Sequence, residues 1–335
     1  MPAGLGGGGY LAIKLEAVLG TYLHPGTAGT VFVPILEESL AYQEDKYYSG
    51  QIRQSTIASE VKSSYYSVQG DVTWEVDPAF LPYFMHCSRH TIAKTGAGPF
   101  EYTYTPSNAG SASTAASGNV ARSASITVFR NGIGFGYAGC NVSQWAFTIE
   151  DGVLRCTMTI LGMSEVDATS NPGTPTWAAA NLFGADAHQV FIAAAAASPT
   201  FGAADVNHNG FTFTANYNAE AQNRIRNDRS ASYISFGETE ATYETELDFL
   251  NRTEFDNFKN ATKRAVRLLS ANGGETFAAA TSAVEITINN STYDAYELGL
   301  AGMGELIMAG VTGRSIGIAG GNPYQIRVKS AADII

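Results

Sequence analysis

Two segments of this 335-residue chain repeat one pattern, and this repeat limits the fold more than any other feature. Gly70–Cys87 aligns with Ala241–Phe258 at an offset of 171 residues. Glu75 then falls on Glu246, and in both segments acidic and apolar residues alternate before giving way to helical spacing. This order predicts a half-buried strand followed by a helix, used twice.

A second, shorter match extends the repeat. Ser125–Val128 aligns with Glu285–Ile288 at an offset of 160 residues, so the first copy would carry 11 extra residues. The tract Ser107–Ser125 is made of small and polar residues and is where an insertion would lie, because a surface loop lengthens at little entropic cost. We therefore expect an N-terminal arm over residues 1–40, a first module over 41–166, a linker over 167–204 and a second module over 205–335.

Turn signals predict antiparallel strands. Asn131-Gly132 and Asp151-Gly152 each separate two stretches of β-forming residues, and both dipeptides accept the positive φ of a tight hairpin turn. Apolar spacing predicts a helix from about Thr253 to Leu269. Ala193–Ala204, broken by proline and glycine, is expected to be a loop. The expected fold class is mainly β with minor α, with duplicated β-sandwich or barrel modules, each flanked by a helix.

The segment Ala41–Gln69 is long, polar and rich in tyrosine. It is expected to form a long loop or extended hairpin with its tip near Ser49-Gly50, and it has too few apolar residues to pack a core alone. A partner surface is the natural explanation, since tyrosine combines a large apolar area with a polar tip. The residues expected to contact such a partner are Tyr47, Tyr48, Ile52, Tyr65 and Tyr66.

The charge balance excludes some classes of function. A formal net charge of -11 disfavours a general nucleic-acid-binding surface, which depends on Lys and Arg. The three cysteines, Cys87, Cys140 and Cys156, are too few and odd in number to indicate a disulfide framework, so folding in a reducing cytosol is expected. No membrane-spanning segment is predicted. The start of the chain does not resemble a secretory signal, and its glycine run indicates an arm.

The strongest candidate for a functional surface is an acidic strand. Glu240, Glu244, Glu246 and Asp248 fall on one face of an extended segment, opposite Tyr243 and Leu247 on the other. Like charges in this arrangement repel one another and resist desolvation, so their face must be wet. It is a solvated outer face that deters edge pairing or the wall of an aqueous passage for a polyanion. A calcium site is the third interpretation, and the segment lacks the spacing and glycine of a calcium-binding loop.

Other motifs are weaker indications of function. His86 and His90 have a spacing that can hold zinc, but no third ligand can be named, and a surface or interface pair is the preferred interpretation. Gly132–Gly136 begins at a hairpin turn and continues as strand, so it does not fit a dinucleotide loop. No catalytic set, metal site or cofactor is predicted, and the chain is not expected to be an enzyme.

Six segments form a recognisable pattern in their order along the chain, namely Gly20–Tyr22, Ile57–Ser59, Gly70–Val76, Trp145–Ile149, Ala221–Arg224 and Phe236–Glu240. Together they resemble the tail tube (major tail) proteins of long-tailed bacteriophages of the siphophage type. The resemblance implies tail-tube-like modules whose subunits form stacked rings around a lumen. It implies a virion protein of the phage tail, made in the host bacterial cytoplasm. The implied partners are further copies of the chain, the tape measure protein and the tail terminator and tail tip proteins, with genomic DNA passing without specific binding.

Most such proteins have one module per subunit and six subunits per ring. Two modules in one chain favour a trimeric ring with pseudo-sixfold symmetry, with a hexamer as the alternative. The residues expected to face the lumen are Asp71, Glu75, Asp77, Glu240, Glu244, Glu246 and Asp248. Two other classes stay open, namely another structural virion protein that is associated with the capsid, and an acidic β-rich hydrolase with convergent titratable groups in a pocket.

Overall fold

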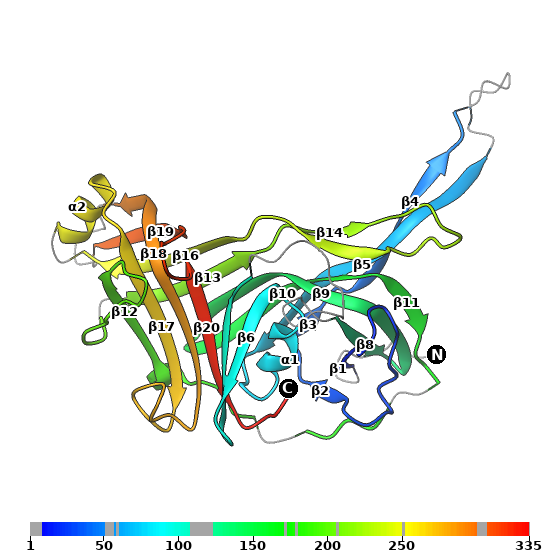
Figure 1. Ribbon diagram of the computed structural model, residues 1–335, viewed down its shortest axis with the longest axis horizontal. Coiled ribbons are helices and arrows are strands. Elements are labelled where there is room, and N and C mark those ends of the chain that lie inside the picture. The colour runs from blue at the N-terminus through cyan, green and yellow to red at the C-terminus, as the bar shows by residue number, and fades with distance from the viewer. Residues whose placement is uncertain are drawn as a thin grey trace.

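The fold is mainly antiparallel β-sheet, with two short α-helices among the described residues, and the expected fold class of mainly β with minor α is confirmed. The computed structural model describes residues 9–50, 57, 60–107, 123–170, 173–177, 180–205, 208–249, 252–299 and 307–334. Figure 1 shows two β-rich halves side by side, with a long hairpin projecting beyond one end of the molecule and α2 at the opposite end.

The first half contains eleven strands and one helix. In chain order these are β1 (Tyr10–Leu15), β2 (Val31–Val33), β3 (Glu37–Glu38), β4 (Ala41–Tyr48), β5 (Val61–Glu75), α1 (Leu81–Met85), β6 (His90–Thr95), β7 (Phe100–Pro106), β8 (Ala124–Arg130), β9 (Ile133–Glu150), β10 (Val153–Gly162) and β11 (Ser164–Asp167). The long strand β9 pairs with β8 and β11 through its first part and with β10 through its second part. Strand β5 continues the sheet on the far side of β10.

The second half repeats this arrangement with nine strands. They are β12 (His188–Ala194), β13 (His208–Asn216), β14 (Ala219–Gln222), β15 (Tyr233–Phe236), β16 (Glu240–Asp248), α2 (Thr253–Lys259), β17 (Arg264–Asn272), β18 (Ser282–Leu298), β19 (Met308–Ser315) and β20 (Tyr324–Ser330), after a 3-10 turn at Ala185–Ala187. Strand β18 pairs with β17 and β20 through its first part and with β19 through its second part. Strand β16 continues the sheet on the far side of β19.

The two halves have β-bulges at matching positions. The β8·β9 pairing has a bulge opposite Tyr137 and Cys140, and the β17·β18 pairing has one opposite Ile288 and Ser291, each 151 positions later. A bulge is a local insertion that needs its own accommodation in the sheet, so a recurrence at matching positions supports a duplicated module. By this register β8 corresponds to β17, whereas the alignment of Ser125–Val128 with Glu285–Ile288 would place β8 on β18.

Strands β5 and β16 also correspond, with a small correction. Gly70 lies opposite Ile160 of β10, and Tyr243 lies opposite Gly313 of β19. The structural offset is thus 173 residues in place of the 171 from the sequence alignment, a slip of two residues that keeps every side chain on its face because the strand period is two. The division into modules stays our proposal, now supported by the strand register.

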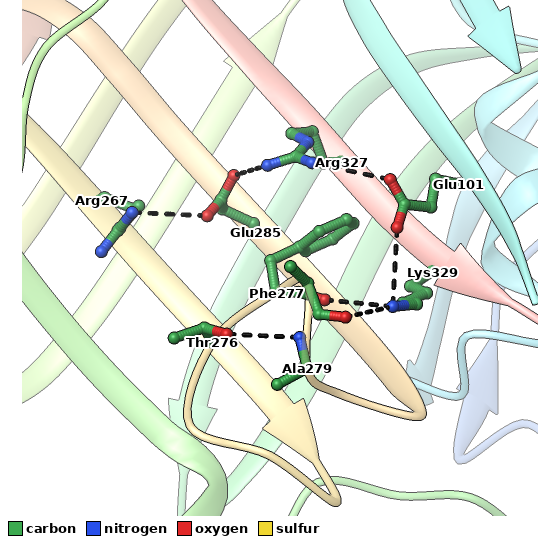
Figure 2. Close-up of polar contacts among 9 residues, drawn as sticks. Glu101, Arg267, Thr276, Phe277, Ala279, Glu285, Arg327 and Lys329 are labelled. Atoms are coloured by element: carbon green, nitrogen blue, oxygen red, sulfur yellow. Dashed lines mark hydrogen bonds and ion pairs between the residues drawn. The ribbon is translucent and has the colours of Figure 1, made fainter. Parts of the chain in front are cut away.

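Two strand pairings join the halves into one continuous sheet. Strand β13 of the second half pairs with β9 of the first, and β20 of the second pairs with β7 of the first. The second join carries ion pairs, drawn in Figure 2: Glu101 of β7 lies 3.5 Å from the ammonium of buried Lys329 and 3.8 Å from the Arg327 guanidinium, both of β20. Arg327 also reaches buried Glu285 of β18 at 2.9 Å.

Most of the core lies between the sheets of each half and continues across the join. Its largest fully buried side chains include Trp74, Trp145, Phe147 and Phe213, which come from both halves. Since these residues alternate with polar ones along their strands, burying them fixes which face of each strand points inward.

Several local expectations are confirmed and others are wrong. Asn131-Gly132 and Asp151-Gly152 have positive φ and close the β8–β9 and β9–β10 hairpins as expected. The predicted helix Thr253–Leu269 ends at Lys259, because Arg264–Asn272 forms strand β17. The predicted loop Ala193–Ala204 begins with the end of strand β12, which pairs with β17.

The N-terminal segment also differs from the expected arm over residues 1–40. Strand β1 lies between β2 and β8 and buries Leu11 and Ile13 completely. Glu16 follows it as a buried carboxylate that accepts hydrogen bonds from Ser123, Ser125 and the amides of Gly20 and Gly139. This segment is therefore part of the first half's sheet from residue 10 onward.

Candidate functional site

One face of the sheet is polar along its whole width, and the expected acidic strand lies within it. In β16, Glu244 and Glu246 are exposed and Glu240 and Asp248 are half-buried, while Ala241, Tyr243, Thr245 and Leu247 between them are buried. The alternation expected from the sequence is confirmed. Tyr243 and Leu247 belong to the core, so the acidic residues face away from it.

The pairs of opposed residues show that this polar face extends across both halves. Glu75 of β5 lies opposite Arg155, which lies opposite Thr148 of β9. Thr148 lies opposite Thr212 of β13, and Thr212 opposite Glu244 of β16. Since directly opposed residues in a pleated sheet share a face, the two acidic strands contribute to one surface although they lie far apart in the chain.

A second row runs parallel to the first. Asp71 lies opposite Thr159, which lies opposite Gln144, and these continue through Asn216 to Glu240. Asp71 Oδ1 accepts a hydrogen bond of 2.6 Å from Thr159 Oγ1. The sheet face thus brings Asp71 and Glu75 together with the four acids of β16, as the sequence alignment of the two segments suggested.

The face has a strong excess of negative charge. Among the described residues, the register places only two basic side chains on it, Arg155 and Arg314, and both are engaged. Arg155 contacts Glu150, and Arg314 lies 2.5 Å from Glu240 and 3.5 Å from Asp294. Glu75, Glu244 and Glu246 therefore contribute much of the negative potential of this face, from the strands on either side of its neutral middle.

Asp77 does not share this face. It is 5% exposed and precedes α1, where its carboxylate accepts hydrogen bonds from the amides of Ala79 at 2.8 Å and Asn181 at 3.0 Å. Its role is to satisfy backbone donors in the turn after β5. The sequence alternation extended the strand by two residues beyond its end at Glu75 and so grouped Asp77 with the wrong surroundings.

Sequence reasoning missed the neutral part of the face. Threonine and amide side chains fill the strands between β5 and β16, and several bond across strands, as Thr73 Oγ1 does with Thr157 Oγ1 at 3.0 Å. The members are Thr73, Gln144, Thr148, Thr157, Thr159, Thr212, Thr214, Asn216, Thr242 and Thr312. A signal existed, since Thr157 and Thr159 alternate with buried Cys156 and Met158, but only pairing shows that these strands are adjacent.

The segment Ala41–Gln69 forms the projecting hairpin, whose strands are β4 and the first part of β5. At Ser49, where a tip was expected, the two strands are still paired, since Tyr48 pairs with Val61 and the Ser49 amide bonds to the Glu60 carbonyl. Tyr47 and Tyr48 are 63% and 64% exposed. Tyr65 is exposed less, Tyr66 is half-buried, and Ile52 lies outside the described residues.

A second, shorter hairpin, β14–β15, lies against the base of the first (Figure 1). Arg229 from its loop reaches Glu44 of β4 at 2.5 Å and donates to the Ser64 carbonyl at 2.9 Å. Hydrogen bonds from Tyr42 and Ser63, together with the nearby Arg229, hold the pKa of Glu44 at about 2. The two hairpins are therefore fastened together by charge at neutral pH.

An open cleft of about 740 Å³ lies between these hairpins. Tyrosines Tyr47, Tyr65 and Tyr66 line one side and Arg226–Arg229 line the other. Ile225, beside this basic stretch, is fully exposed. Exposed apolar and aromatic side chains therefore gather at the projecting end of the molecule.

The remaining candidates of the sequence do not form a site. His86 and His90 are both buried, not at a surface, and His90 bonds to Ser88 and Tyr217. All three cysteines are buried and unpaired. Within the described part of the chain, no three His, Cys, Asp or Glu side chains are grouped so as to hold a metal ion. None of the described helices is long and apolar enough to cross a membrane.

Comparison with known proteins gives a family for this fold and surface. The family model described as phage tail tube protein matches residues 6–323, which is nearly the whole chain. No curated protein matches the chain.

Proposed function

This chain belongs to the phage tail tube protein family, and we propose that its copies polymerise into stacked rings whose polar sheet faces form the wall of the tail tube lumen. The family makes it a structural protein of the virion tail. Polymerisation, the orientation of the sheet and the passage of DNA are our proposals.

The observation that carries the proposal is the continuous polar face from β5 to β19. It runs across both halves and is polar except for Ala146, which lies between Thr157 and Thr214, and Met308 opposite Asp248, while the opposite side of the same strands holds the core. A closed ring of such sheets would have an inner wall of carboxylates and hydroxyls. The carboxylates repel DNA phosphates, and the hydroxyls are neutral.

The range of this repulsion suits a conduit. Electrostatic forces across water decay within about 8–10 Å at physiological salt, so a close-fitting polyanion would feel the wall without being blocked at the centre. Arg155 and Arg314 contribute little attraction for phosphate because each already contacts a carboxylate. DNA would therefore pass without specific binding.

The projecting hairpins are proposed to contact the next ring in the stack. Tyr47 and Tyr48 present aromatic area to solvent at the far end of the longer hairpin, and burying it on a neighbouring ring is favourable by about 25 cal/mol per Å². The tape measure protein in the lumen and the terminator and tip proteins at the ends of the tube complete the proposed set of partners.

A purely structural role accounts for this surface better than hydrolysis or attachment to a capsid. The acids are spread along strands facing open solvent, whereas a hydrolase needs titratable groups that converge in a pocket. Family membership over residues 6–323 also favours the tube.

Electron microscopy of the purified full-length chain after concentration tests the proposal. We expect hollow tubes with stacked rings. Closed shells, or a chain that stays monomeric at millimolar concentration in the presence of its tape measure and tip proteins, would contradict it.

A further inference from the structure

The register of one half of the molecule can be transferred to the other strand by strand. The β9·β10 pairing has a bulge between Val142 and Gln144, and the β18·β19 pairing has one between Tyr293 and Ala295, again 151 positions later. Together with the bulges of the β8·β9 and β17·β18 pairings, this fixes which residue of β18 corresponds to each residue of β9.

The edge strands correspond in the same way. Ala41 pairs with Gln69 at the base of β4, and Thr214 of β13 pairs with Thr242, both 173 positions later. Glu37 of β3 pairs with Thr73, and Gly210 pairs with Glu246, at the same offset. Residues from β3 to the start of β4 are thus the first half's counterpart of β13.

Within one chain, β13 joins the halves by pairing with β9. Thr214, Ala215 and Asn216 lie opposite Ala146, Trp145 and Gln144. Applying the two offsets to these pairs gives Ala41 opposite Glu297, Tyr42 opposite Tyr296, and Gln43 opposite Ala295. Strands β4 and β18 lie at opposite ends of the molecule in Figure 1, so these pairs cannot form within one chain.

Both edges have the surface that such a join needs. Over the described residues, strand β4 pairs only with β5, and the part of β18 from Ala295 to Leu298 pairs only with β19. Ala41, Tyr42 and Gln43 are exposed, and Leu298 is 45% exposed. An unpaired strand edge offers its backbone groups to another chain.

The side chains of the two edges match as well. Tyr42 and Tyr296 correspond to Ala215 and Trp145, which are fully buried at the join within the chain. Gln43 and Ala295 correspond to Asn216 and Gln144, which lie on the polar face. Pairing in this register therefore continues both the apolar and the polar face of the sheet.

Hydrogen bonds at Leu40 limit how far the pairing between chains extends. At Leu40 the backbone amide bonds to the Glu38 carboxylate at 3.1 Å, and the carbonyl accepts a bond of 2.6 Å from Arg130 Nη2. Arg130 also holds Glu38 through two nitrogens. The edge is closed at Leu40 by the chain itself, so a partner strand begins at Ala41.

We propose that neighbouring chains join through antiparallel pairing of Ala41–Gln43 of one chain with Ala295–Glu297 of a second copy, in the register that joins the two halves of one chain. The inference rests on the proposed function for the existence of the ring, and it adds the strands and register of the joint between chains. The polar face would then run unbroken from one chain to the next.

Disulfide trapping tests this register in the full chain. Ala41→Cys with Glu297→Cys places two thiols on directly opposed positions, whose Cβ atoms are about 4.5–5.5 Å apart in a sheet. The matched control, Gln43→Cys with Glu297→Cys, puts them on diagonal positions about 7–8 Å apart by backbone, too far for a disulfide without movement. The wild-type chain and the three single variants show the background from Cys87, Cys140 and Cys156.

After assembly and mild oxidation, the in-register pair should form covalent oligomers roughly tenfold more efficiently than the control, ending at a covalently closed ring. Assembly is followed separately by electron microscopy. Tubes that form normally without preferential in-register trapping would overturn the inferred joint and leave the proposed function intact. If the wild-type chain forms no tubes, the proposed function itself fails.

Discussion

Individual buried residues set how this chain tolerates acid and substitution. His90 is the clearest example, since it is buried where the two halves meet, among Ser88, Tyr217, Tyr324 and Tyr104. Ser88 donates its hydroxyl to the Met85 carbonyl, so His90 Nδ1 donates to Ser88, and Nε2 accepts from Tyr217 at 3.1 Å. This geometry suits a neutral imidazole, and burial lowers the pKa of His90 to about 3.

The first prediction is a loss of stability in acid that depends on His90. Below pH 6.5 the unfolded chain binds a proton at this residue that the folded chain does not, so stability falls as the pH decreases towards 3, by up to about 1.4 kcal/mol per pH unit. Above pH 6.5 the residue contributes no pH dependence. Urea unfolding of wild type and His90→Asn between pH 4 and 7.5 measures the difference in slope.

Burial also lowers the pKa of His188 and His208, so the wild type and the His90→Asn variant should both lose some stability in acid. Only the difference between the two curves belongs to His90. Parallel curves would show that His90 takes up its proton without unfolding.

The second prediction concerns Glu285, which is 4% exposed and lies 2.9 Å from Arg327 and 3.6 Å from Arg267. Glu285→Ala leaves both guanidinium groups without this partner and should lower the free energy of unfolding by about 3–5 kcal/mol. Glu275→Ala, an exposed acid in the nearby β17–β18 loop, should change it by less than about 0.5 kcal/mol. Chemical denaturation of both variants checks this, and equal effects would mean that the ion pairs of Figure 2 do not stabilise the fold.

At the scale of elements, local patterns predicted strands and turns well and predicted helix length poorly. The alternation in β16 and the two dipeptide turns depend on neighbouring residues alone. The helix stripe from Thr253 was extended too far because Val266 and Leu269 also fit helical spacing. In the structure they lie on a strand that is buried on both faces. Such a strand lacks the alternation of apolar and polar residues that would distinguish it from a helix.

Other elements depend on contacts that no local pattern contains. The local sequence of strand β1 does not distinguish it from an arm, because its role depends on pairing with β8, more than a hundred residues later. The neutral residues of the polar face were missed for the same reason, since the adjacency of β9 and β13 follows from a join between the halves. Sequence indicated the two acidic strands, and pairing showed that they share one surface.

The third prediction follows from that surface. Glu244→Lys with Glu246→Lys exchanges two exposed acids of the face for bases, so we expect tubes to assemble while DNA ejection slows, with the defect easing as salt rises. The matched control, Asp186→Lys with Glu275→Lys, makes the same change in net charge at exposed sites outside the face. Ejection is timed by dye uptake of released DNA, and equal rates for both variants would remove the polar face from the lumen.

The fourth prediction concerns the longer hairpin. Tyr47→Ser with Tyr48→Ser removes exposed aromatic area, so the monomer should keep its stability within about 0.5 kcal/mol while stacking of rings is lost. Ile133→Ser is the control, since Ile133 is 53% exposed but belongs to the β8–β9 hairpin and to neither of the two projecting hairpins. Thermal unfolding and electron microscopy separate the two effects. Normal tubes from the double variant would assign the hairpin a different role, and so would normal tubes after deletion of Tyr47–Ser55.

At the scale of the whole molecule, the repeated register bears on the number of chains in a ring. If each half occupies one position of a sixfold arrangement, three chains close the ring. The fifth prediction is therefore that isolated rings have the mass of three chains by native mass spectrometry. A mass of six chains would place one chain at each position and would mean that the two halves are not equivalent in the assembly.

The hairpin β6–β7 makes the two kinds of joint in such a ring mechanically unequal. Inside a chain the halves are joined by two strand pairings, β13 on β9 and β7 on β20, and by the contact of Arg229 with Glu44 between the projecting hairpins. The second half has no matching hairpin, because only Asn260–Lys263 connect α2 to β17. In a tube of these chains, each chain would be a stiff segment and the joints between neighbouring chains would be more flexible. Bending or osmotic shock would open the tube at the joints between chains before the halves of any one chain separated.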